Sequence, residues 1–142
     1  MLPSMSTTLM QIVKKVLLVV MGIGYIAAGW NHFRDPNFYL PMMPPYLPWH
    51  LPLIYASGVF EMLLGAMVLL PWTRRLGALG LVLLLIAIAP ANLHMALHNI
   101  PPPGVGPLPP YALWLRLALQ PVLIAWAAWY LPRGSGRPAT QR

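Results

Sequence analysis

The stretch LIYASGVFEMLLGAMVLL, residues 53–70, decides the fold. It contains a single charged side chain, Glu61, and prolines at positions 52 and 71 mark its two ends. A helix needs about 20 mostly apolar residues to cross the ~30 Å of hydrocarbon in a bilayer. We therefore predict a membrane-spanning helix here, with a carboxyl group near its middle.

Composition extends this interpretation to the whole chain. Of the 142 residues, 58% are hydrophobic and 8% are charged, whereas a soluble domain carries about 25% charged residues. Three further apolar stretches are long enough to span a bilayer, at about 12–30, 76–97 and 111–131. The prediction is an all-α fold: an integral membrane four-helix bundle over residues 12–131, multi-pass in the cell membrane.

The basic residues indicate how this bundle is oriented. Seven of the nine lie at the start of the first span, between the second and third spans, or after the fourth: Lys14, Lys15, Arg74, Arg75, Arg133, Arg137 and Arg142. Only Arg34 and Arg116 belong to the opposite side. Because positively charged loops stay in the cytoplasm, we predict that both termini are cytoplasmic. These termini are a short segment at 1–11 and a polar tail at 132–142, which we expect to be disordered.

A cleavable signal peptide is the alternative interpretation of the first span. Two lysines, an apolar run and the sequence IAAG resemble such a peptide with its cleavage site. Cleavage would put the C-terminal arginines on the wrong side of the membrane, so we expect an uncleaved signal anchor.

The composition also excludes several classes of function. The chain has no cysteine, which excludes disulfides, thiol redox chemistry and thiolate metal sites. Its basic residues are scattered and form no stripe on any predicted helix, so we predict no binding of nucleic acid.

Two proline-rich loops join the predicted spans on the outer side, NHFRDPNFYLPMMPPYLPWH at 31–50 and NIPPPGVGPLPP at 99–110. Proline lacks a backbone N–H and resists helix formation, and tyrosine and tryptophan rings settle at the headgroup boundary. The first loop is predicted to be a stiff cap over the outer mouth of the bundle; the alternative is a flexible linker. Glycines spaced seven apart, Gly22 with Gly29 and Gly58 with Gly65, predict close helix contacts within the bundle.

Glu61 is the first candidate functional residue. A carboxylate in mid-membrane costs about 2.5–3.5 kcal/mol, so it must be protonated, paired or beside water. Arg116 is the candidate cation in a span, and Gln120 follows it by four residues on the same helix face. We expect a Glu61–Arg116 ion pair, with either a structural role or a role in ligand binding or proton movement. The alternative is a protonated Glu61 that donates to a ligand carbonyl.

More polar residues gather at the predicted outer ends of the first and third spans. His94 and His98 lie four residues apart, but two histidines without a carboxylate make a weak metal motif, so we predict no metal site. Haem held by His32 and His94 is a further alternative. No catalytic residue is predicted. The predicted ligand-binding residues are Asn31, His32, Glu61, Asn92, His94, Arg116 and Gln120.

Four motifs resemble the DoxX-like family of small four-span membrane proteins, over about residues 20–130. They are AGWNHF followed by P-x-F, the M-P-P-x-L-P-x-H loop, the Y-x-S-G-x-x-E-x-x-x-G span and the P-A-N-x-x-M segment. The resemblance implies a four-span fold. It also points to Asn31, His32, Glu61, Pro90 and Asn92.

Some members of that family are similar to a membrane subunit of thiosulfate:quinone oxidoreductase. The resemblance therefore implies a membrane subunit or anchor of a quinone-linked oxidoreductase. We expect an outward-facing polar pocket around Glu61, Asn92 and Arg116 that receives a quinone-like headgroup, and no intrinsic cofactor, since the sequence has no flavin, nucleotide or haem motif. The alternative is a non-enzymatic protein that binds a small ligand or lipid, or acts as an assembly factor. Expected partners are membrane lipids, oxidoreductase subunits or further copies of the chain.

Overall fold

The computed structural model describes residues 5–104, 106 and 108–131, and this part of the chain contains helices and no strand. The elements are α1 (Met5–Arg34), η1 (Pro36–Phe38), η2 (Leu40–Met42), α2 (His50–Leu69), α3 (Arg74–His98) and α4 (Pro110–Ala128). Four of these helices are long and apolar enough to cross a membrane. The predicted all-α class with four candidate spans is confirmed, and the predicted tail at 132–142 lies outside the described residues.

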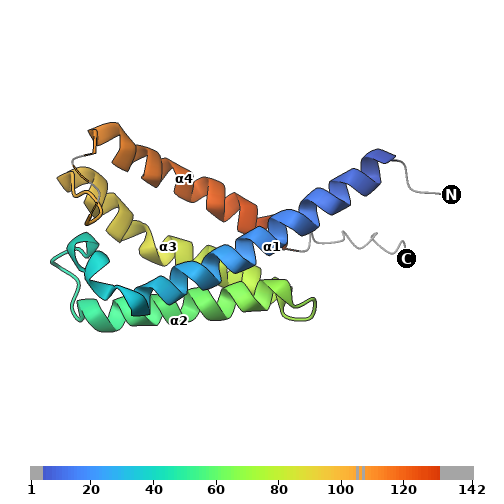
Figure 1. Ribbon diagram of the computed structural model, residues 1–142, viewed down its shortest axis with the longest axis horizontal. Coiled ribbons are helices and arrows are strands. Elements are labelled where there is room, and N and C mark those ends of the chain that lie inside the picture. Colours follow the sequence, from blue (N-terminus) through green and yellow to red (C-terminus); the bar gives the residue numbers. More distant parts are fainter. Residues whose placement is uncertain (1–4, 105, 107, 132–142) are drawn as a thin grey trace, which may run out of the picture.

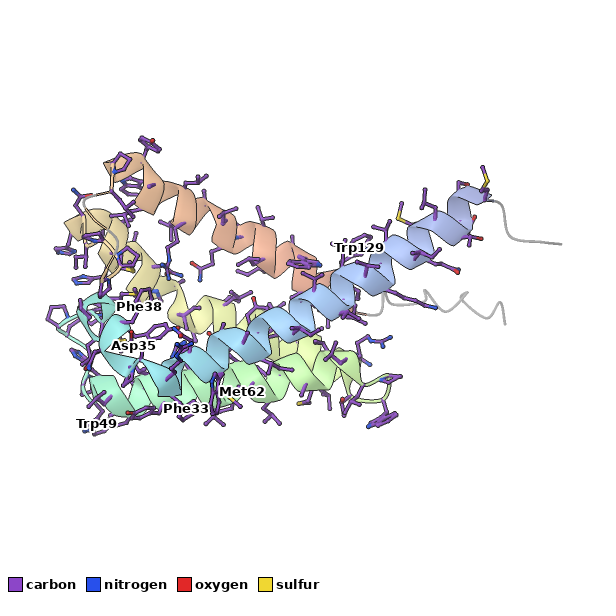
Figure 2. The ribbon with its side chains drawn as sticks, viewed as in Figure 1. Phe33, Asp35, Phe38, Trp49, Met62 and Trp129 are labelled. Carbon is purple, nitrogen blue, oxygen red and sulfur yellow. The ribbon has the colours of Figure 1, made fainter. Side chains whose placement is uncertain are left out.

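Local chemistry explains where α1 ends and the first loop begins. Asp35 precedes Pro36, whose ring disfavours helical geometry in the residue before it, and Asp35 is extended with φ −141° and ψ 73°. Its carboxylate then accepts a hydrogen bond from the backbone N–H of Phe38 at 3.2 Å. Asp35, one of the two acidic residues in the chain, therefore caps the short helix η1. Its side chain lies beside Phe38 (Figure 2).

The four helices pack in the order of the chain: α1 on α2, α2 on α3, and α3 on α4. In the described part of the chain, the backbones of α1 and α4 make no contact. The two helices converge at one end of the bundle and diverge toward the end that carries the loops (Figure 1). We call these the terminal end and the loop end. At the terminal end the hydroxyl of Tyr130 donates to the carbonyl oxygen of Lys14 at 2.9 Å.

Glycines bring the backbones of α1 and α2 together, as their spacing predicted. A Cβ atom on Gly29 would lie 2.5 Å from the carbonyl oxygen of Gly58, and one on Gly65 would lie 2.7 Å from that of Gly22. Neither position has room for a larger side chain. We call this contact the α1–α2 seam.

The first loop lies on the bundle instead of projecting from it. Met42 in η2 is 4% exposed and packs in a cluster with Met95, Ala96 and Leu113 from α3 and α4. The ring of Tyr39 stacks on that of His32, with 3.8 Å between ring centroids. The predicted cap over the loop end is confirmed.

Candidate functional site

Glu61 is buried where α1 meets α2. It shares a helix face with Gly58 and Gly65, since residues three and four apart lie on one side of a helix. Those glycines draw α1 close, and the Glu61 residue is 7% exposed. The same packing brings His32, itself 7% exposed, to the carboxyl group. Its Nε2 lies 3.4 Å from Glu61 Oε2.

The surroundings of His32 define where its protons lie. Its Nδ1 is 2.9 Å from the carbonyl oxygen of Ile54 and 3.1 Å from the hydroxyl of Ser57. That hydroxyl donates to the same carbonyl, so both neighbours act as acceptors and Nδ1 carries the hydrogen. The other nitrogen, Nε2, then faces Glu61. A single proton on this pair would make it either a carboxylic acid beside a neutral imidazole or a carboxylate beside an imidazolium.

The expected ion pair between Glu61 and Arg116 is not formed. Among the described residues, His32 is the partner within ion-pair distance of Glu61. Arg116 is exposed on α4, and α4 packs on α3 while diverging from α1. Arg116 lines the same two hollows as Glu61 but forms no ion pair with it. The sequence prediction of this pair was wrong because the position of Arg116 along its span gives its height and not its distance from α2.

Two hollows meet at Glu61. The first, which we call the loop-side cavity, has a volume of about 410 Å³ beneath the first loop, and its polar lining comprises His32, Tyr39, Ser57, Glu61, Asn92 and Arg116. The second, which we call the α1–α4 cleft, has a volume of about 440 Å³, and its polar lining comprises Tyr25, Glu61, Asn92, Arg116, Gln120 and Trp126. Glu61, Asn92 and Arg116 line both. The remaining lining of each hollow is mostly apolar.

Asn31 acts on the loop. Its amide nitrogen donates to the hydroxyl of Tyr39 at 3.0 Å, which holds the tyrosine ring over His32. Burial is the main reason why the pKa of Tyr39 lies above its ordinary value, so this hydroxyl stays protonated at neutral pH. Asn31 thus positions the Tyr39 ring at the loop-side cavity.

The two histidines near the end of α3 lie apart from this site. His98 Nδ1 lies 3.0 Å from the carbonyl oxygen of His94, and the two rings are 4.1 Å apart. Neither residue lines either hollow. In the part of the chain that the structure describes, no group of three or more His, Asp or Glu residues could hold a metal ion. Both ring nitrogens of His32 face protein groups, which disfavours the haem alternative.

Residues 21–131 match the model of a family described as a domain of unknown function, DUF8561. The chain belongs to the DUF8561 family. No curated protein and no solved structure is similar enough to the chain to count as a match. The DUF8561 region includes Glu61, His32 and all the polar residues that line the two hollows.

Four further site residues of this DUF8561 chain were not predicted: Tyr25, Tyr39, Ser57 and Trp126. Tyr25 Oη, Trp126 Nε1 and Glu61 Oε2 are buried atoms for which the described part of the chain offers no hydrogen-bond partner. All three residues line the α1–α4 cleft. The sequence did contain a signal for Tyr25 and Trp126, since a phenol or an indole inside an apolar span needs a hydrogen-bond partner.

Proposed function

We propose that this chain spans the cell membrane and binds the polar headgroup of a quinone-like lipophilic molecule beside Glu61. The observation that supports it is the position of Glu61: a buried carboxyl group with an unbonded oxygen, where two largely apolar hollows meet. Ligand sites are typically apolar hollows of about 300–1,000 Å³ with a few polar groups that orient the ligand. A quinone matches such a lining with its apolar tail and its carbonyl oxygens.

The Glu61–His32 pair suits a ligand that exists in two redox forms. In apolar surroundings the uncharged form of the pair is favoured, with the proton on Glu61. At 3.4 Å from Nε2, the carboxyl group lies beyond the 2.5–3.2 Å of a good hydrogen bond, so a ligand carbonyl competes well for its proton. When His32 holds the proton, the carboxylate accepts from a ligand hydroxyl. The same two side chains can thus bind a quinone or a quinol.

The place of this binding in a larger assembly is part of the proposal. The resemblance to DoxX-like proteins supports a membrane subunit or anchor of a quinone-linked oxidoreductase. Because the sequence carries no flavin, nucleotide or haem motif, the electrons would come from a partner subunit. The competing function is a non-enzymatic protein that binds a lipid or small ligand, and the α1–α4 cleft favours it, because the cleft lies between two helices whose backbones make no contact in the described part of the chain.

The proposed topology places both termini in the cytoplasm and the loop end on the outer face. It is supported by the basic residues at the terminal end of the helices, such as Lys14, Arg74 and Arg75. Reporter fusions after Arg142 and within residues 99–110 test it. A cytoplasmic signal from the second fusion would reject this topology.

Purification from native membranes tests the headgroup proposal. We expect mass spectrometry of an organic extract to find quinone with the wild-type protein, and a short-chain benzoquinone to raise its unfolding temperature. Glu61→Leu should lose both effects, while His98→Asn, whose side chain lies away from both hollows, should keep them. A wild-type preparation that contains lipid alone and is not stabilised by the benzoquinone would favour the non-enzymatic function.

A further inference from the structure

The α1–α4 cleft contains polar atoms that its own walls do not satisfy. Tyr25 Oη comes from α1, Glu61 Oε2 from α2 and Trp126 Nε1 from α4, and each is buried without a hydrogen-bond partner in the described part of the chain. Buried polar groups in proteins nearly always have a partner, and the hydrocarbon of a bilayer supplies none. Tyr25 Oη and Trp126 Nε1, from two helices that line one cleft, point to a missing ligand.

The polar side chains nearby do not complete these bonds. Gln120 is buried and already donates its amide hydrogen to the carbonyl oxygen of Leu85. Glu61 Oε2 is the oxygen that lies 3.4 Å from His32 Nε2. Trp126 Nε1 can only donate, and Tyr25 Oη donates or accepts. Tyr25 Oη and Trp126 Nε1 are therefore two donors without a bonded acceptor in the described part of the chain.

The shape of the cleft limits what can enter it. A Cβ atom built on Gly24, which lines the cleft, meets nothing within 4 Å, so there is open space between α1 and α4. The cleft volume is about 440 Å³. This volume lies in the range of about 300–1,000 Å³ that is typical of small-ligand sites, so a lipid chain or a small ring fits it.

We propose that the α1–α4 cleft holds a second binding site for a lipophilic molecule that carries a carbonyl oxygen, with Tyr25 and Trp126, which do not line the loop-side cavity, as its donors. Tyr25 Oη and Trp126 Nε1 donate to that oxygen. The carbonyl can belong to the ester of a glycerolipid or to a quinone ring. The inference rests on the proposed function only in placing the helices in a bilayer.

Conservative substitutions that remove one donor each provide the test. Delipidated protein in detergent is titrated separately with a short-chain phosphatidylglycerol and with a decyl benzoquinone, and the Kd and unfolding temperature are measured. We expect Tyr25→Phe and Trp126→Phe each to weaken binding of at least one probe about threefold to tenfold, the loss of one hydrogen bond. Tyr111→Phe and Trp114→Phe, exposed on α4, are the matched controls and should bind like wild type.

The unfolding temperature measured without a probe shows whether the Tyr25 hydroxyl serves to bind a ligand or to stabilise the fold. Tyr25→Phe removes a hydroxyl that is unpaired in the empty cleft, so the empty variant should unfold at the wild-type temperature or above it. A lower temperature, with unchanged affinity for both probes, would show a structural role and overturn the proposal.

The two probes identify the source of the carbonyl. A donor-dependent Kd for phosphatidylglycerol alone assigns the cleft to lipid, and one for the benzoquinone alone assigns it to quinone. If the benzoquinone fails to bind wild type while lipid binding depends on Tyr25 and Trp126, the proposed quinone function fails and the second site stands. Wild-type Kd values in both variants, or no binding of either probe to wild type, would overturn the second site.

Discussion

The two sides of α1 are built in opposite ways. On one side, Gly22 and Gly29 place its backbone directly against α2, at Gly58 and Gly65. On the other side α1 diverges from α4, and the cleft between them holds unpaired polar atoms. The α1–α2 seam makes a permanent contact that buries Glu61. The α1–α4 cleft leaves the same carboxyl group accessible from one direction. If the proposed ligand binds in the cleft, stability and ligand binding depend on different faces of one helix.

The largest expected effect comes from placing a bulky residue on each of the two faces of α1. It tests the contrast between the α1–α2 seam and the α1–α4 cleft. Gly29→Leu forces side-chain atoms against the backbone of Gly58 and should lower the free energy of unfolding by about 3 kcal/mol, the upper range for overpacking. Gly24→Leu enters open space in the cleft and, because leucine is a better helix former, should unfold at or above the wild-type temperature. Thermal unfolding in detergent measures both.

The same pair of variants has an opposite effect on the ligand. Gly24→Leu should fold and lose binding in the cleft, since its side chain fills the space. Similar destabilisation by the two leucines would mean that α1 packs equally tightly on both sides, and the contrast would be abandoned.

The next largest change in stability tests whether His32 or Arg116 is the partner of Glu61. His32→Phe removes the donor to the carbonyl of Ile54 and the only described partner of Glu61, and should cost about 2 kcal/mol. Arg116→Met, at an exposed position, should change the free energy of unfolding by less than about 0.5 kcal/mol. Glu61→Gln keeps the shape of the neutral acid and should cost about 1 kcal/mol or less while weakening ligand binding.

Chemical unfolding of the three variants measures these differences. An ion pair between Glu61 and Arg116 makes a different prediction. Glu61→Gln would then cost about 3–5 kcal/mol, and adding Arg116→Met would restore part of the loss. That pattern would restore the pairing expected from the sequence and count against the geometry seen here.

The elements of the fold could be predicted from the sequence because they depend on local properties. Apolar length predicts the helices, proline predicts the loops, and the glycine spacing predicts the α1–α2 seam. The depth of Glu61 in its span likewise marked it as a site residue. Membrane insertion and orientation remain predictions.

The partner of Glu61 could not be predicted because it depends on how the helices are tilted relative to one another. Position along a helix gives the height of Arg116 but not its distance from α2, and α4 diverges. His32 was named as a site residue, yet its contact with Glu61 requires the close approach of α1 at Gly58. Tyr25 and Trp126 were not predicted as site residues: a polar ring atom in a span signals that it needs a partner, but only the assembled cleft shows that the partner is missing.

The smallest predicted effect concerns how the first loop closes the loop end of the α1–α2 seam. Tyr39→Phe keeps the ring that stacks on His32 and removes the hydroxyl that accepts from Asn31. The loss should be about 1 kcal/mol or less at pH 7. Tyr46→Phe, on the same loop with 68% of its surface exposed, is the control and should be neutral.

The pH dependence of this small effect identifies its source. Burial raises the pKa of Tyr39, so the folded protein holds the phenol proton more tightly than the unfolded chain does. The stability from this proton is fully present below the unfolded pKa of about 10 and is lost as pH rises through the higher folded pKa. The advantage of wild type over Tyr39→Phe should therefore hold from pH 7 to 9 and shrink above about pH 10. Other tyrosines ionise in both proteins and cancel in the difference. A difference in unfolding temperature that stays constant up to pH 11 would show that the Tyr39 hydroxyl remains open to solvent, and the first loop would then not seal the seam.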